Sequence, residues 1–386
     1  MNTVHASPRF FQLDVLRGVA ILGLLLLNIS AMGFVALGYV NFSPILLSDQ
    51  IVDVVNALLF DGRFRSLFSL LFGIGLFLQM QKLTQDGMVE LSPIKSRLKW
   101  LLVFGILHCT FIWAGDILII YALSGLFILK YIHLPTDKML NTAIKFIAVG
   151  LIILLLEGLL GLYFDEQGDI YRNSETFLSL YQTISLGYFE YLSEQIVYTL
   201  ANIIFFPIYM FYFSGVMLLG VALYKKGLFS VGLSNSQLHI LVKLIIFVSV
   251  LDALCRWYYP LTGFYLVMSF SSLSGLLMAI AITHYIVKYM NDRNVIYQLL
   301  AKTGRLAFTL YILQSIVMVT LFRFITPELL LTFTRTDYLL MACAFILIQL
   351  AFSFVYFQIF NIGPLEKLWR LLIKKRDNKL SIHKLP

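Results

Sequence analysis

Residues Leu151–Phe164 read LIILLLEGLLGLYF, an apolar run interrupted by one carboxylate, Glu157. Leu101–Leu107, LLVFGIL, is a second run and has no polar side chain. The strands of a transmembrane β-barrel would alternate apolar and polar residues, whereas unbroken runs of this kind are typical of helices in a bilayer. The sequence therefore predicts membrane-spanning helices and not a barrel.

The composition extends this prediction to the whole chain. Of its 386 residues, 60% are hydrophobic and only 13% are charged, whereas a soluble chain averages about half apolar and about a quarter charged. Such a chain has too little polar surface to cover itself in water. It is predicted to be a polytopic membrane protein with membrane lipids as partners. The three cysteines show no metal-type spacing, so no metal site is expected.

The net charge of +8 would also suit a nucleic-acid partner, but its distribution argues against one. The lysines and arginines lie in short loops between apolar segments. This is the ordinary signature of membrane topology. No nucleic-acid partner is therefore expected.

The apolar runs predict an all-α fold, a polytopic membrane helical bundle of about ten transmembrane helices, because about 20 apolar residues cross a bilayer as one helix. The piece 48–60 is too short to span and is predicted to be an interfacial or re-entrant helix with Ser48 or Asp49 as its N-cap. Residues 1–365 are predicted to form one membrane domain, followed by a basic cytoplasmic tail, 366–386. The predicted spans are 18–38, 64–82, 99–114, 116–133, 141–163, 198–224, 239–259, 263–289, 304–325 and 337–360.

The charged loops predict the orientation of these spans. The third and fourth are joined by a tight turn at AGD and should form a hairpin. With the N-terminus inside, the cytoplasmic loops carry most of the lysines and arginines, which places both termini in the cytoplasm. The longest outside loop, about 164–197, carries one arginine, Arg172, against six carboxylates: Asp165, Glu166, Asp169, Glu175, Glu190 and Glu194.

Two arginines depart from this rule. Arg63 and Arg65, in FDGRFRSLF, lie near the predicted outer end of the second span, where basic residues are disfavoured. They are either residues of a substrate site or anchors at the level of the lipid headgroups.

The first span carries a polar stripe. Ionisable side chains at membrane depth cost about 2.5–3.5 kcal/mol on insertion scales and are usually paired or functional. Eleven residues at about 100° each bring Arg17 and Asn28 within about 20° of one helix face, about 16 Å apart. Asp14 precedes Arg17 by three residues and is placed to pair with it. The alternative is that Arg17 contacts lipid phosphates while Asn28 bonds a neighbouring helix.

A second polar group lies in the predicted hairpin. Arg97 and His108 are also eleven residues apart, and Asp116 follows in the tight turn. A histidine and an aspartate in one hairpin can serve as a general base and its orienting carboxylate. The alternative is that His108 makes only an interhelical hydrogen bond.

Two further features complete the set of ionisable candidates. Glu157 is a lone carboxylate, expected to face the bundle interior and a candidate proton relay. Asp252 and Arg256 are four residues apart, a spacing that predicts a local ion pair with a structural role.

Five stretches together resemble the YeiB-like bacterial membrane proteins, also known as domain of unknown function family 418. The resemblance runs nearly from end to end and implies a bacterial cytoplasmic membrane protein. The stretches are LDVLRGVAILGLLLLNISAMG (13–33), FSLLFGIGL (68–76), RLKWLLVFGILHCTFIWAGDILIIYALSGL (97–126), GRLAFTLYILQS (304–315) and GPLEKLWR (363–370).

The family is more distantly similar to the transmembrane acyltransferases. In the acyltransferase-three enzymes a first-helix arginine, matched here by Arg17, is followed eleven residues later by a histidine that is important for transfer, and Asn28 stands at that position. The heparan glucosaminide N-acetyltransferases resemble this chain in D-x-x-R-G and in the asparagine, and they place a catalytic histidine in the following loop. This sequence has Tyr39 there and no histidine nearby.

The acyltransferase resemblance implies a mechanism in which His108 replaces the missing base. An acyl-CoA enters from the cytoplasmic side, and Arg17 and the basic loops, including Arg97, hold its phosphates. Asn28 donates to the carbonyl oxyanion. His108 with Asp116 deprotonates a hydroxyl or amine of an envelope glycan or lipid acceptor.

In the same implied mechanism, Arg63 and Arg65 lie at the outer opening through which the acceptor enters. The competing class is a transporter or lipid-handling protein without covalent chemistry. In that class the same intramembrane charges line a substrate path, and Glu157 or His108 relays protons.

Overall fold

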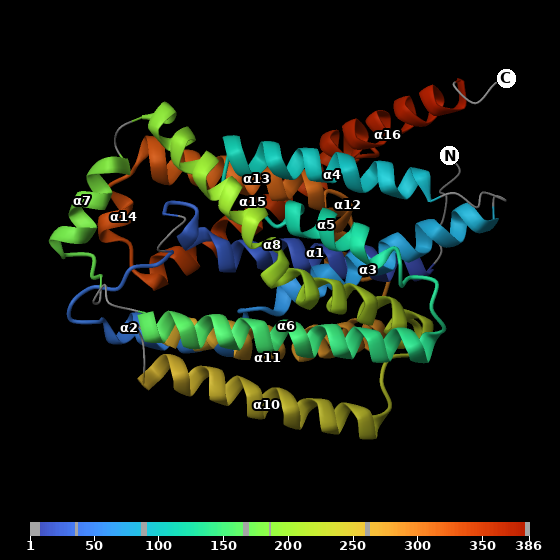
Figure 1. The fold of residues 1–386 in the computed structure, drawn as a ribbon, viewed down its shortest axis with the longest axis horizontal. Helices are drawn as coiled ribbons and strands as arrows, with labels where there is room; N and C mark the ends of the chain where they lie inside the picture. Colours follow the sequence, from blue (N-terminus) through green and yellow to red (C-terminus); the bar gives the residue numbers. More distant parts are fainter. Residues whose placement is uncertain are drawn as a thin grey trace.

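The computed structural model describes residues 8–34, 38–85, 91–164, 170–184, 187–258 and 263–382. Throughout these ranges the secondary structure is helical, with no strand (Figure 1), so the predicted all-α helical bundle is confirmed. The helices are α1 (Pro8–Asn28), α2 (Leu47–Leu59), α3 (Arg63–Gln85), α4 (Ser92–Phe111), α5 (Leu118–Ile128), α6 (Thr136–Phe164), α7 (Glu175–Ile184), α8 (Tyr188–Lys225), α9 (Leu228–Val231), α10 (Asn235–Tyr258), α11 (Gly263–Tyr289), α12 (Val295–Arg305), α13 (Ala307–Thr320), α14 (Leu329–Thr332), α15 (Arg335–Ile359) and α16 (Pro364–Ile382).

Within the described ranges, 8 helical segments are long and apolar enough to cross a membrane. The predicted third and fourth spans are not among them. The first half of α4 carries Lys95, Arg97 and Lys99, and α5 has 11 residues, about 16 Å against a hydrocarbon core of about 30 Å. The 8 segments are Phe11–Ala31, Leu47–Gln85, Thr136–Gly161, Tyr188–Lys225, Asn235–Tyr258, Met268–Tyr289, Ala307–Ile325 and Arg335–Ile359.

α5 begins at Leu118, two residues after the predicted start of the fourth span, because side chains engage the backbone of the α4–α5 turn. It also ends at Ile128, five residues before the predicted end. The amide of Ala114 donates to Gln195, that of Ile117 to the Tyr311 hydroxyl, and that of Ile119 to Asp116. These contacts replace helical hydrogen bonds over the turn. The predicted hairpin is present, since α4 packs against α5.

The short predicted helix 48–60 is α2, which packs against α10 and α15. It breaks sharply before α3 at Gly62, whose φ of 74° is unfavourable for residues with a Cβ. The guanidinium of Arg63 donates to the carbonyl oxygens of Leu58 at 2.9 Å and Asp61 at 2.5 Å. Arg63 therefore satisfies the open C-terminal end of α2.

The predicted N-cap of α2 is wrong. Leu46 occupies that position and makes no side-chain cap, while Ser48 and Asp49 lie inside the helix. The carboxylate of Asp49 instead accepts hydrogen bonds from the Tyr39 hydroxyl and from the backbone N–H of Arg335.

α1 is the most enclosed candidate span, lying in the middle of the bundle between α4 and the α6–α11 layer (Figure 1). Of the apolar stretch of α1 that could cross a membrane, 61% is buried, against 22% for the corresponding stretch of α15. Two glycines bring α1 against α12. A Cβ on Gly18 would meet the carbonyl oxygen of Leu300 at 2.0 Å, and one on Gly304 would meet that of Asp14 at 1.9 Å. Glycine is therefore required at both positions for this backbone approach.

The two ends of the bundle differ in character. The beginning of α4 and all of α16 lie toward one end, and α7 and α14 lie at the other (Figure 1). We call the first the basic end, after Lys82, Lys95 and Arg97. Of the predicted outside loop, residues 165–169 and 185–186 lie outside the described residues. α16 crosses the predicted domain boundary at 365/366, and its first turns pack against α4 and α13; the boundary itself stays a prediction.

An ion network joins the break between α2 and α3 to α10. Arg256 donates to Asp252 at 3.1 Å, which confirms the predicted pair, and also to Asp53 at 3.3 Å and to Asp61. Asp53 also binds Arg335 of α15 at 2.9 Å. The guanidinium of Arg256 therefore joins α10 to two carboxylates of α2 and the α2–α3 break.

Candidate functional site

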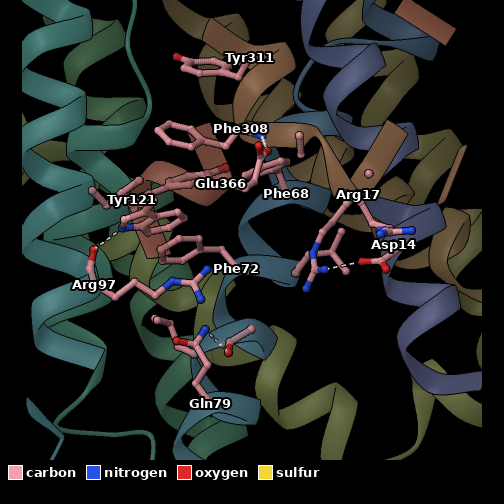
Figure 2. Close-up of a pocket in the computed structure, with 18 of the residues that line it drawn as sticks. Asp14, Arg17, Phe68, Phe72, Gln79, Arg97, Tyr121, Phe308, Tyr311 and Glu366 are labelled. Carbon is pink, nitrogen blue, oxygen red and sulfur yellow. Dashed lines mark hydrogen bonds and ion pairs between the residues drawn. The ribbon is translucent and has the colours of Figure 1, made fainter. Parts of the chain in front are cut away.

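A cavity of about 630 Å³ lies between α1, α3, α4, α5, α12, α13 and α16. Each of the five stretches that carry the family resemblance contributes to its wall, although they are scattered over the chain. Representative lining residues, one from each stretch, are Arg17, Phe72, Arg97, Tyr311 and Glu366 (Figure 2).

The cavity is cationic where it opens. Its lining includes the exposed basic residues Lys82, Arg305 and Arg370. The basic lining residues are Arg17, Lys82, Arg97, Arg305 and Arg370, against the carboxylates Asp14 and Glu366.

Both carboxylates already have partners. Asp14 pairs with Arg17 at 2.6 Å, as the three-residue spacing predicted. Glu366 accepts hydrogen bonds from the backbone N–H groups of Phe308 at 3.0 Å and Thr309 at 3.1 Å, and so caps the N-terminus of α13. Because five basic residues line the cavity against these two carboxylates, its lining carries a net positive charge.

Of these cations, Arg97 has the surroundings that most favour binding of an anion. Its guanidinium lies 4.4 Å from the Trp369 ring, and Trp369 Nε1 donates to the Arg97 carbonyl at 3.2 Å. Arg97 Nε has no hydrogen-bond partner in the described part of the chain. Burial, together with the charges of Arg17 and Arg370, lowers the pKa of Arg97. Arg17 lies on the opposite wall (Figure 2), so an anion between them would relieve this repulsion.

The interior of the cavity is apolar and aromatic. Phe68, Phe72, Tyr121 and Phe308 face it from α3, α5 and α13 (Figure 2). Along α3 the lining runs from Lys82 to Phe68, fourteen residues or about 21 Å. The space is therefore long and suits an extended apolar chain that carries an anionic end.

The deep end of the cavity meets the predicted histidine–aspartate pair. His108 Nδ1 lies 2.9 Å from Asp116 Oδ1, with both residues buried. Tyr311, which lines the cavity, donates to the same oxygen at 3.2 Å. His108 Nε2 has no partner among the described residues. The hairpin thus brings the two predicted residues into contact, although neither of them lines the cavity.

Asp14, Arg17 and Arg97 are the predicted site residues that share the cavity. Asn28 ends α1 before the 3₁₀ turn Ile29–Ala31 and is not among the lining residues. It lies four residues beyond Leu24, a lining residue of the same helix.

Arg63 and Arg65 also lie outside the lining. Arg63 is buried and bonds Ser249 Oγ at 3.2 Å in addition to the end of α2. Arg65 donates to Ser272 Oγ at 3.3 Å. Their contact with an acceptor stays a prediction.

Glu157 does not face the bundle interior, so that expectation is wrong. It is exposed on α6, and Tyr209 donates to it at 3.3 Å. α6 is apolar on both its packed and its exposed faces, which is why hydropathy did not distinguish them. A proton-relay role for Glu157 stays a prediction.

Several lining residues were not singled out from the sequence. Tyr311, Arg305, Glu366 and Trp369 lie in stretches quoted only for the family resemblance. A tyrosine in an apolar span resembles an ordinary packing residue, and Glu366 was assigned to the tail. The packing of α16 on α4 and α13 brings Glu366 and Trp369 to the cavity, and the packing of α12 and α13 on α1 brings Arg305 and Tyr311.

These features define a polytopic membrane protein with a cationic, aromatic cavity at one end of its helical bundle. A family model described as "Protein of unknown function (DUF418)" matches residues 223–376. The Escherichia coli (strain K12) protein named "Uncharacterized protein YeiB" is 32% identical over 94% of this chain and 96% of its own length. The chain therefore belongs to the YeiB-like DUF418 family.

Two further bacterial relatives align along most of the chain. "Uncharacterized protein YxaH" of Bacillus subtilis (strain 168) is 27% identical over 94% of each chain. The "Uncharacterized 39.9 kDa protein in amylase 3'region" of Bacillus acidopullulyticus is 26% identical over 100% of this chain and 99% of its own. No solved structure matches. The apolar helices and bacterial relatives fit a protein of a bacterial cytoplasmic membrane.

Proposed function

We propose that the cavity binds an acyl-CoA donor and that the protein transfers its acyl group to a hydroxyl or amine acceptor of the cell envelope. The observation that carries this proposal is one cavity with a cationic mouth, an aromatic interior, and a hydroxyl bonded to Asp116 at its deep end. Acyl transfer needs these three elements, which are a phosphate clamp, a channel for the thioester arm, and a proton acceptor.

The mouth supports the donor assignment through its charge. Arg17 and Arg97 face one another across the cavity (Figure 2), and guanidinium groups bind phosphate bidentately. With both termini in the cytoplasm, as the basic loops predict, this mouth opens toward the cytoplasmic pool of acyl-CoA. The phosphates would lie at the mouth and the pantetheine arm along the aromatic wall.

The acceptor approaches from the opposite end in this proposal. Asn28 and Arg65 lie beyond the last lining residues of their helices, Leu24 and Phe68, on the side away from the mouth. Asn28 as an oxyanion donor, and Arg63 and Arg65 as acceptor contacts, remain part of the proposal on this basis. The buried His108–Asp116 pair takes up the proton of the acceptor.

A second candidate function is lipid handling or transport without covalent chemistry. One observation favours it: His108 and Asp116 lie behind the wall and do not line the cavity. A cavity with a cationic mouth and an apolar interior also suits a lipid phosphate. The two functions share the ligand class and differ in whether a thioester is cleaved.

Binding of radiolabelled palmitoyl-CoA and acetyl-CoA to the purified protein in lipid nanodiscs tests the proposal. Arg17→Gln and Arg97→Gln should each weaken binding about tenfold or more, because hydrogen bonds to charged groups contribute about 1.5–3 kcal/mol. Lys95→Gln is the matched control, since Lys95 is exposed on the same helix and outside the lining.

Transfer is then followed with cell-envelope extract, by release of CoA thiol and labelling of an acceptor. Thiol release that requires both the protein and the extract supports acyl transfer. Arginine-dependent binding of dodecyl phosphate and acyl-CoA without thiol release supports lipid handling instead. Binding of neither probe, or equal binding by the arginine variants, contradicts both functions.

A further inference from the structure

We infer that Tyr311 carries the proton between the acceptor in the cavity and the buried Asp116–His108 pair. This inference rests on the proposed acyl transfer and answers the difficulty that the base lies behind the cavity wall. It assigns a catalytic role to a residue that neither the motifs nor the spacing singled out.

The contacts of Tyr311 connect the cavity with the buried Asp116–His108 pair. Tyr311 lines the cavity, and its hydroxyl accepts the Ile117 N–H at 3.1 Å and donates to Asp116 Oδ1 at 3.2 Å. A phenolic oxygen has a second lone pair. Ile117 and Leu118 also line the cavity, so the wall here includes the turn that holds Asp116.

Asp116 is fixed in the geometry that a relay needs. Its Oδ2 accepts the Ile119 N–H at 2.9 Å, and its Oδ1 is shared by His108 Nδ1 and the Tyr311 hydroxyl. The carboxylate therefore has no freedom to turn away. The His108 and Tyr311 rings lie 5.1 Å apart between centroids, so all three side chains form one packed unit.

A second tyrosine of the cavity, Tyr121, shows why the position of Tyr311 matters. Tyr121 also lines the cavity, but its hydroxyl bonds Ser69 Oγ at 2.8 Å and the Arg65 carbonyl at 3.0 Å. Neither partner can take up a proton at neutral pH. Tyr311 has a carboxylate behind its hydroxyl, and Tyr121 does not.

The proton balance of the step closes without a further reactant. The acceptor oxygen attacks the thioester carbonyl, a C–O bond forms and the C–S bond breaks. The acceptor proton passes to the Tyr311 oxygen while the Tyr311 proton passes to Asp116 Oδ1. Reversal of this movement returns the proton to the leaving thiolate, which gives ester and free CoA thiol. His108 is a positioning residue here, since it holds Asp116 from the side away from the cavity.

Tyr311→Phe tests the inference because it removes the hydroxyl and keeps the ring. Acyl-CoA binding should remain within about twofold, while kcat for thiol release falls about 10²–10⁴-fold, the range for loss of a general acid–base group. Tyr191→Phe is the control: its hydroxyl bonds the Ile112 carbonyl of the same turn at 2.5 Å, and Tyr191 is outside the lining. It should transfer at close to the wild-type rate.

The outcomes separate this inference from the proposed function. Wild-type rates in Tyr311→Phe overturn the relay and leave acyl transfer standing. A loss of binding that accounts for the whole loss of rate also overturns it, because Tyr311 would then only shape the cavity. If Tyr191→Phe lowers kcat by the same factor, the effect comes from disturbance of the α4–α5 turn and the relay is overturned. Absence of transfer by the wild-type protein removes the proposed function, and the relay with it.

Discussion

The backbone of Gly304 packs directly against the carbonyl oxygen of Asp14, so closely that a Cβ on Gly304 would meet that oxygen at 1.9 Å. This contact joins two stretches nearly three hundred residues apart and sets one corner of the cavity, since Asp14 and Gly304 both line it. The basic residues that follow, Arg17 and Arg305, are brought to the mouth by the same approach.

Gly304→Ala should lower the apparent Tm of the purified protein. The added methyl group meets backbone, which cannot rotate away, so we expect a cost of about 1–3 kcal/mol. Gly18→Ala should act similarly against Leu300. Gly75→Ala is the matched control, because nothing lies within 4 Å of a Cβ there. An unchanged Tm in both Gly18 and Gly304 variants would show that α1 and α12 separate without cost.

Glu366→Gln should loosen the attachment of α16. The carboxylate caps α13 through the amides of Phe308 and Thr309, and loss of such a cap costs about 1 kcal/mol. Hydrogen–deuterium exchange at these two amides should therefore accelerate by roughly five- to tenfold. Lys367→Gln, at the next and exposed position, should leave exchange unchanged. Equal exchange in the two variants would argue against the cap.

Arg256→Gln should destabilise the bundle more than any surface change. It leaves Asp252, Asp53 and Asp61 without their shared guanidinium, and breaking a buried pair from one side costs about 3–5 kcal/mol. The measurement is the Tm in detergent together with the yield of folded protein. Lys243→Gln on the exposed face of α10 is the control. A Tm equal to that of the control would show that water replaces the guanidinium.

The basic end should face the cytoplasm. In a variant without native cysteines, Thr176→Cys on α7 should react with a membrane-impermeant thiol reagent in intact cells, because α7 lies at the end opposite the basic residues (Figure 1). Lys95→Cys should react only after the cells are opened. The reverse pattern would invert the topology and place the cavity mouth outside.

The sequence by itself determined the class of fold, because unbroken apolar runs admit only helices in a bilayer. It also determined contacts set by spacing along one helix, such as Asp14–Arg17 and Asp252–Arg256. The start of α5 could not be predicted from the sequence, since two of the side chains that hold the α4–α5 turn come from α8 and α13.

Tertiary structure alone decided which residues share a site. Asp14, Arg97, Tyr311 and Glu366 belong to four different helices, and local periodicity carries no information about which helix faces meet. The same limit explains Glu157, whose apolar neighbours on every side gave no sign that it lies on the exposed face of α6. Helix formation depends on neighbours in the chain, whereas the cavity depends on how distant helices pack.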